Sequence, residues 1–427
     1  MIRRPPRSTR KESSAASDVY KRQVNSRTKI LRANLADAEG TEVGAVIDFY
    51  SNGFQSVGTG GGGGSGQVNK NANTYIYMAF AADPDTEAPT VAKSFGIQTW
   101  SGDNSTTRTI SGYGFQPSLV WVKWRTGNYN HAHILYTNLL NNPSANSGLS
   151  SSSNAALNSY KLTQFTDDGF QFASPINAVN ETNFTFVGWA WKADDNEATI
   201  NDNGSIDSLV SANANAGFSI VKYDGTQAGG ATVGHGLSAA PNMIIVKRLD
   251  YAEDWVVYHS SLGNTKTLNL NTSDAEVTDA AFNNTTPSST VFTLSNCASG
   301  SCINSNSGTY IAYCFHDIAG YSKFGSYTGT AGALTVTTGF QPDFLMVKNT
   351  TSAGYSWYIL DSVRGGSGGY INKFLAAESS QAETEVTNGD IDVTFTSTGF
   401  QYASTMSSTD GFNKSGDTYI YMAIKIN

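Results

Sequence analysis

Five histidines are the side chains of this 427-residue chain best suited to acid–base or metal chemistry. No pair of them stands with two carboxylates at the spacing of a metal site, and no nucleophile adjoins a base in a known motif. We therefore expect no catalytic residue, no metal site, no cofactor and no enzymatic activity. The histidines are His131, His133, His235, His259 and His316.

Three related five-residue segments give an internal test of this expectation. They end in Thr137, His259 and Asp361. One mechanism cannot use a hydroxyl, an imidazole and a carboxylate in the same role. What recurs around these positions is glycine, proline, aromatic residues and lysine, which build turns, strands and cores.

Residues 201–207 faintly resemble a calcium-binding loop, because Asn, Asp and Ser alternate there around an Asn-Gly pair. The bidentate glutamate that closes such a loop is missing, and Asn-Gly is also an ordinary turn signal. Whether calcium binds the polar segment 194–207 stays open at this point.

Three cysteines are too few for a disulfide framework. Cys297 and Cys302 are close enough in sequence to close a small loop. Cys314 falls in a predicted strand.

Three sequence patterns recur and organise the chain. An aromatic strand pattern that opens with Thr occurs at 74–80, 185–191, 309–315 and 418–424. A pattern of two Phe around one Gly occurs at 49–54, 165–170 and 395–400. A pattern from Pro to Lys occurs at 117–123, 241–247 and 342–348.

These patterns divide the chain into repeated modules of domain size, each long enough to bury its own core. Module 1 covers 95–195, module 2 covers 214–318 and module 3 covers 319–427. Residues 24–83 form a truncated module that should be less ordered or should dock onto a neighbour. Residues 193–213 form a polar linker.

The first 23 residues do not belong to the fold. They lack an apolar segment and any hydrophobic periodicity, so they do not match a secretory signal. They resemble translated sequencing-adapter read-through, and we expect them to be disordered or artefactual.

The repeated segments have the chemistry of β-strands. They are short, rich in β-branched and aromatic residues, and bounded by Pro and turn residues. Segments 120–124 and 310–315 are apolar on both faces, so they should be covered on both faces or pack into a sandwich core. We expect an all-β fold of tandem antiparallel β-sandwich modules, of jelly-roll or concanavalin-like type.

Charge argues against nucleic acid and membrane partners. The formal net charge is −8, and removing the first 23 residues leaves 20 basic against 33 acidic residues. Such a chain repels nucleic acid and anionic membranes. No run approaches the 18 apolar residues that span a bilayer.

Recognition should lie in the loops that follow the Pro-to-Lys strands, namely 125–132, 249–254 and 349–356, because these loops differ while the strands recur. The recurring lysines, Lys123, Lys247 and Lys348, either hold their amines in water or contact a ligand. The seven tryptophans either form the core or stack on sugars. The candidate binding residues are Arg125, Asn128, Tyr129, Asn130, Asp250, Tyr251 and Tyr355.

Residues 216–225, 233–241, 254–263 and 319–329 resemble a module of bacteriophage tail fibres and other virion surface proteins. Residues 351–365 are similar to its marine-phage variant. The resemblance covers 95–427 and part of 40–83. It implies a lectin-like β-sandwich on a virion tail without assigned catalytic residues.

The resemblance implies attachment to a host-surface glycan or protein receptor, together with other tail proteins as partners. A homotrimer is expected by analogy with fibres. The alternatives are an extracellular bacterial lectin or adhesin, and a polysaccharide-depolymerising tailspike.

Overall fold

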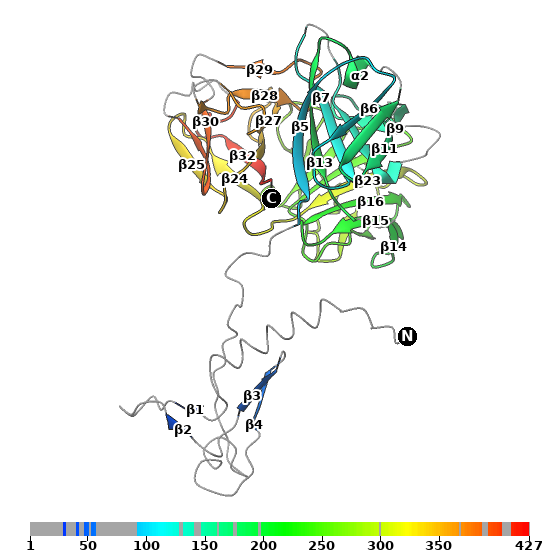
Figure 1. Ribbon diagram of the computed structural model, residues 1–427. Coiled ribbons are helices and arrows are strands. Elements are labelled where there is room, and N and C mark those ends of the chain that lie inside the picture. Colours follow the sequence, from blue (N-terminus) through cyan, green and yellow to red (C-terminus); the bar gives the residue numbers. More distant parts are fainter. Residues whose placement is uncertain are drawn as a thin grey trace, which may run out of the picture. The chain divides into compact units, whose positions relative to one another are not determined.

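The chain divides into two units, 1–84 and 85–427 (Figure 1). The first 23 residues, the predicted strand 74–80 and most of the truncated module lie outside the residues that the computed structural model describes. The described residues are 29–30, 40–41, 47–50, 53–56, 92–127, 131–140, 147–159, 162–173, 177–194, 198–298, 300–366, 369–386, 392–403 and 411–426.

The prediction of an all-β fold is confirmed. Antiparallel strands account for almost all regular structure of the described residues, because short β-branched and aromatic runs favour strands. The helical segments of that part are single turns, α2 (Asn177–Asn180) and η2 (Asn138–Leu140). In the first unit, two hairpins pair β1 (Lys29–Ile30) with β2 (Gly40–Thr41) and β3 (Ile47–Tyr50) with β4 (Gly53–Ser56).

The pattern of two Phe around one Gly forms a hairpin in each copy. Phe49 faces Phe54 across the first copy. The glycine is required where a third strand approaches, because a Cβ at Gly169 would lie 1.9 Å from the backbone oxygen of Ile110. The other two copies pair Phe165 with Phe170 and Phe395 with Phe400.

Each module contains one large sheet in which the Thr-aromatic strand pairs with a neighbouring strand on both sides. In module 1 the strand order is β10-β9-β8-β7-β13-β5, in module 2 it is β14-β15-β16-β23-β18-β19-β20-β21, and in module 3 it is β24-β32-β26-β27-β28-β29.

The strands of these sheets, in module order, are β5 (Phe95–Ser101), β7 (Leu119–Trp124), β8 (Ile134–Thr137), β9 (Ser147–Ser150), β10 (Asn158–Ser159), β13 (Thr185–Trp191); β14 (Thr199–Asn201), β15 (Ser208–Asn213), β16 (Phe218–Asp224), β18 (Met243–Arg248), β19 (Val256–His259), β20 (Lys266–Asn269), β21 (Val277–Thr278), β23 (Thr309–Phe315); β24 (Ser322–Thr328), β26 (Phe344–Asn349), β27 (Trp357–Asp361), β28 (Lys373–Ala376), β29 (Thr384–Glu385) and β32 (Thr418–Ile424).

A small sheet covers one face of each large sheet. The small sheets have the orders β11-β12-β6, β17-β22 and β25-β31-β30. Their strands are β6 (Thr107–Ser111), β11 (Leu162–Thr166), β12 (Gly169–Ala173), β17 (Ala231–Gly234), β22 (Val291–Leu294), β25 (Leu334–Thr337), β30 (Val393–Thr396) and β31 (Gly399–Tyr402).

The central strands are apolar on both faces because each face lies in a different core. In β13, Phe186 and Ala190 pack into the core of module 1, whereas Val187, Trp189 and Trp191 enter a core that all three modules share. Strands β23 and β32 alternate in the same way. One face of each of the three large sheets therefore packs into one common core.

The seven tryptophans are all buried, which confirms the core interpretation over sugar stacking. The most exposed is Trp100, at 8%. The others are Trp121, Trp124, Trp189, Trp191, Trp255 and Trp357.

The polar linker predicted at 193–213 is partly regular structure, which corrects that interpretation. Strand β15 from this segment pairs along β16 and β14 pairs with β15, so both extend the sheet of module 2. The counterparts of β16 in modules 1 and 3 are β5 and β24, and both are sheet edges in the described part of those modules. Tertiary pairing thus overrides the turn-rich local sequence.

Candidate functional site

The recurring lysines join the modules to one another. Lys123, Lys247 and Lys348, which we call the junction lysines, are fully buried. Their Nζ atoms donate to backbone oxygens of the neighbouring modules, at 2.9 Å from Lys123 to Ser380, 3.2 Å from Lys247 to Asn154 and 3.3 Å from Lys348 to Ser273. Both predicted roles, an amine in water and a ligand-contacting amine, are therefore wrong.

These contacts close a cycle. The lysine of module 1 binds module 3, that of module 2 binds module 1 and that of module 3 binds module 2. In each case the lysine Nζ donates to a backbone oxygen at the equivalent position of the neighbouring module. A second set of equivalent bonds runs alongside, in which the oxygens of Arg125, Leu249 and Thr350 accept from Glu383, Leu157 and Glu276 at 2.9, 3.0 and 2.8 Å. The three modules form a ring related by approximate threefold symmetry.

The predicted recognition loops begin inside these junctions. Each loop also accepts a hydrogen bond from the junction lysine of its own module. The acceptors are the backbone oxygens of His131, Glu253 and Tyr355, at 2.5, 2.9 and 2.8 Å. Differences between the loops therefore reflect different module neighbours as well as any outside partner. Only the parts of each loop that turn away from the junction can meet a ligand.

Arg125, a predicted binding residue, is committed to the junction of modules 1 and 3. Its guanidinium forms a two-point ion pair with Glu383, at 2.8 and 3.0 Å. Arg364 binds the same carboxylate at 2.9 Å and Asp361 at 2.6 Å, while Trp189 donates to Asp361 at 2.9 Å. The predicted residues Asn128, Tyr129 and Asn130 lie outside the described residues.

Two predicted residues come together in module 2, in what we call the Tyr251 site (Arg248, Asp250, Tyr251 and Glu253). The Tyr251 ring is 61% exposed and lies 5.1 Å from the Arg248 guanidinium. Asp250 and Glu253 hold that guanidinium at 3.0 and 2.9 Å. The hydrogen bonds from Arg248 lower the pKa of Asp250. The site thus sets two carboxyl groups around one guanidinium.

The remaining predicted residue, Tyr355, belongs to what we call the Tyr355 site of module 3 (Ser352, Tyr355, Lys414 and Asp417). The Lys414 Nζ lies 5.6 Å from the half-buried Tyr355 ring. The same Nζ binds Ser352 Oγ at 2.9 Å and Asp417 Oδ2 at 3.1 Å. Both sites thus set an aromatic ring beside a cation that carboxylates hold in place.

With this geometry described, comparison with known proteins identifies a family. The chain matches the family described as "Domain of unknown function (DUF7483)" over residues 90–426. The chain belongs to the DUF7483 family. The matched range takes in modules 1, 2 and 3 together, and no curated protein matches the chain.

Sequence reasoning missed a residue that fixes the loop ends of the DUF7483 domain. Asn180, Asn304 and Asn413, which we call the anchor asparagines, are buried. Each Oδ1 accepts from the loop that follows β5, β16 or β24, at 3.3 Å from Asp103, 2.8 Å from Thr226 and 2.8 Å from Thr330. A signal was present, because each asparagine stands five residues before the Thr that opens a central strand.

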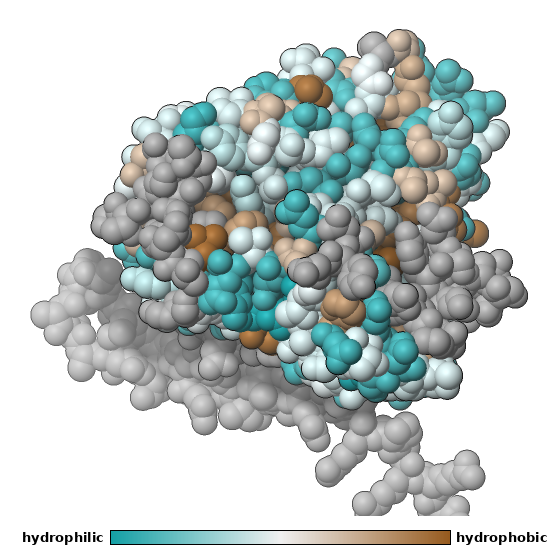
Figure 2. All heavy atoms as spheres, turned by 90° about the horizontal axis from the view of Figure 1, so that it is seen from above, coloured by the Kyte–Doolittle hydropathy of each residue, from teal (hydrophilic) through white to brown (hydrophobic). Residues whose placement is uncertain are grey.

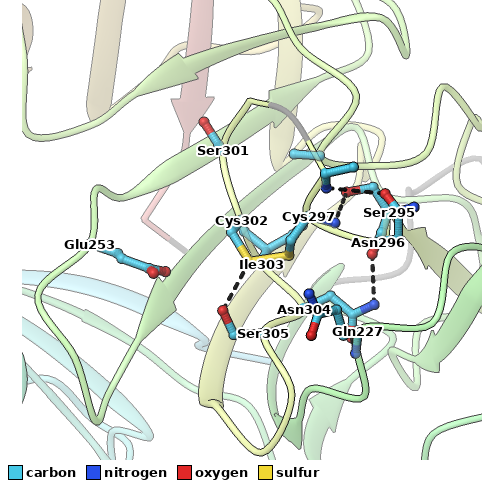
Figure 3. The surroundings of a disulfide bond; sticks show 12 residues. Gln227, Glu253, Ser295, Asn296, Cys297, Ser301, Cys302, Ile303, Asn304 and Ser305 are labelled. Carbon is cyan, nitrogen blue, oxygen red and sulfur yellow. Dashed lines mark hydrogen bonds between the residues drawn. A yellow bond between two sulfur atoms is a disulfide. The ribbon is translucent and has the colours of Figure 1, made fainter.

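A disulfide between Cys297 and Cys302 closes the small loop that precedes Asn304 (Figure 3). Cys302 Sγ lies 3.0 Å from Ser305 Oγ, and that oxygen accepts from Arg248 Nη1 at 3.1 Å. The disulfide therefore supports the Tyr251 site through one intervening side chain. Cys314 is a buried free thiol whose pKa burial raises.

The surface of the DUF7483 domain offers few other candidates. In Figure 2 one face is mostly hydrophilic, with hydrophobic residues in small separate patches. The described residues hold no group of three or more His, Cys, Asp or Glu that could bind a metal, in the calcium candidate 194–207 or elsewhere. In the same residues no helix is long and apolar enough to cross a membrane. The exposed large hydrophobic residues are Ile200, Tyr251, Val277 and Val363.

Proposed function

We propose that this protein is a non-catalytic component of a bacteriophage tail fibre that attaches the virion to a glycan on the host surface. The resemblance of 95–427 to a virion surface module supports the proposal. The disulfide supports a place outside the reducing cytosol, because such bonds persist in oxidising surroundings. An extracellular bacterial lectin would share both features, and neighbouring tail or baseplate genes would separate the two.

The observation that carries the proposal is the exposed ring of Tyr251. The negative face of an aromatic ring attracts the C–H edges of a pyranose, and polar groups beside the ring can bind its hydroxyls. Asp250 and Glu253 supply carboxylate acceptors at the same place, and charge-assisted bonds are the stronger ones. Because Arg248 already pairs with both carboxylates, they are held in position before a ligand arrives.

Charge narrows the ligand class. The Tyr251 site holds two carboxylates against one guanidinium, and the whole chain has a net charge of −8. Sialylated, phosphorylated or sulfated sugars would be repelled. We therefore propose a neutral pyranose as the ligand.

Affinity at a shallow site of this kind is expected to be low. A millimolar dissociation constant corresponds to about −4 kcal/mol. Repeated sites on a virion can raise the apparent affinity by roughly 10² to 10⁴ without new contacts. Weak single contacts are therefore compatible with firm attachment.

The test is binding of the full-length chain to a printed array of bacterial and mammalian glycans. We expect binding to neutral glycans, and we expect Tyr251→Ala to lower it by roughly tenfold, because the stacking face is lost. Ile200→Ala, which removes a 75% exposed apolar side chain from β14, is the matched control and should bind like the wild type. Equal binding by wild type and Tyr251→Ala would contradict the proposed site.

A further inference from the structure

We propose that module 3 carries a second glycan-binding site, formed by Tyr355, Lys414 and Ser352, which makes one ring bivalent for neutral pyranoses. This inference rests on the proposed function. It starts from the constellation that modules 2 and 3 share. In each, a tyrosine ring lies beside a cation, at 5.1 Å for Arg248 and 5.6 Å for Lys414, and a carboxylate holds the cation.

The two constellations use different positions of the repeat. In module 2 the cation is Arg248, directly after the junction lysine. In module 3 that position is Asn349, and the cation is Lys414, directly after the anchor asparagine. The residue after the anchor asparagine of module 2 is Ser305. A packing feature that the fold required would occupy equivalent positions, so the shared arrangement points to a shared ligand chemistry.

The Tyr355 site is held rigidly by the fold. Asn349 is buried, its Nδ2 donates to Asp417 at 2.9 Å, and its Oδ1 accepts from the backbone of Thr351 and Ser352 at 2.9 Å each. Asp417 in turn holds Lys414. The loop and the cation are therefore fixed before binding, which lowers the entropic cost of binding a ligand.

Lys414 keeps one donor for a ligand. An ammonium group has three N–H donors. Two of them bind Ser352 Oγ and Asp417 Oδ2, and the third has no partner among the described residues. The side chain is 36% exposed, so the third donor can reach a sugar hydroxyl while the Tyr355 ring stacks on the sugar face. Lys414 and Asp417 cancel in charge, which again suits a neutral pyranose.

The two sites belong to one rigid ring. Modules 2 and 3 are tied by Lys348 and by the backbone bond from Glu276 to Thr350. Once one site is occupied, the second meets its sugar at a raised effective concentration if the glycan spans both. Loss of either tyrosine ring should then lower binding to a dense glycan surface by more than the affinity of one site alone suggests.

The experiment measures the full-length chain on printed glycan arrays at two densities. Tyr355→Ala should lower binding by roughly tenfold or more on the dense array, and the double variant Tyr251→Ala/Tyr355→Ala should abolish it. Tyr355→Phe keeps the ring and should bind like the wild type. The melting temperature of Tyr251→Ala should match the wild type because its ring is exposed. The Tyr355 ring is half-buried, so the melting temperature of Tyr355→Ala is measured beside its binding, and Tyr355→Phe controls for the packing of the ring.

The outcomes separate this inference from the proposed function. Loss with Tyr251→Ala and wild-type binding with Tyr355→Ala would overturn the second site and leave the first intact. Loss with Tyr355→Ala alone would support the second site and overturn the first. Equal loss with Tyr355→Phe and Tyr355→Ala would overturn stacking at Tyr355. A wild type that binds no glycan would overturn both.

Discussion

At the scale of single residues, burial changes the chemistry of lysines and histidines that the sequence alone would place in water. Burial lowers the pKa of Lys123 to about 7 and the pKa of Lys247 and Lys348 to about 8. Lys247 nevertheless donates three hydrogen bonds to backbone oxygens, which requires the ammonium form. These amines are buried and hydrogen-bonded at the junctions, so they are not available as nucleophiles.

Buried histidines predict acid sensitivity. Burial lowers the pKa of His259 to about 4, against 6.5 for a free histidine. Between pH 6.5 and 4 the unfolded chain therefore binds more protons than the folded chain, so the free energy of unfolding falls as pH falls through this range. His235 and His133 shift in the same direction.

We expect His259→Asn to weaken that dependence. The asparagine oxygen can still accept the Ser261 N–H that the His259 Nδ1 accepts at 3.1 Å, but the residue does not titrate. The wild type should lose about 2 kcal/mol through His259 between pH 7 and pH 5, and the variant should not. Denaturant titrations at both pH values measure this, and identical losses in the two proteins would refute it.

At the scale of elements, the strands could be predicted and their partners could not. The recurring short, β-branched and aromatic segments identified β13, β23 and β32. Apolar residues on both faces of 120–124 and 310–315 indicated strands that are covered on both faces or packed into a sandwich core. What covers the second face is another module, and contacts such as Lys123 with Ser380 join residues 257 positions apart. Nothing in local periodicity encodes such pairs. The loop prediction failed in part for the same reason, since Arg125 forms an ion pair with Glu383 of module 3.

The anchor asparagine and the disulfide make a prediction for the loop end of module 2. Closing a loop of about six residues should stabilise the domain by about 2 kcal/mol. Asn304 still holds the neighbouring loop by bonds to Thr226, Ala228 and Ser295 when the disulfide is opened.

We therefore expect Cys297→Ser/Cys302→Ser to lower the free energy of unfolding by that amount while the fold persists. Chemical denaturation with and without reductant measures the loss. Reductant should destabilise the wild type and leave the double variant unchanged. If reductant destabilised both equally, the effect would have to come from elsewhere in the molecule.

At the scale of the whole molecule, the three repeats are parts of one ring of modules and not independent domains. The sequence suggested sandwiches in tandem, whereas the second unit unites all three around one core and three equivalent junctions. Every junction in the described part is completed within the chain. A homotrimer therefore stays a prediction that rests on fibre analogy alone, and it would have to use other surfaces.

The central claim is that the three modules are one cooperative ring, and native-state hydrogen exchange tests it most directly. Lys247→Met removes three part-buried hydrogen bonds to backbone oxygens, one of which crosses the junction of modules 2 and 1, and should cost about 2 to 4 kcal/mol. The free energy of exchange in β13, β23 and β32 should fall together by the same amount, while Lys222→Met, at a half-buried position of β16, leaves all three unchanged. A fall confined to β23, with β13 and β32 as protected as in the wild type, would contradict the ring.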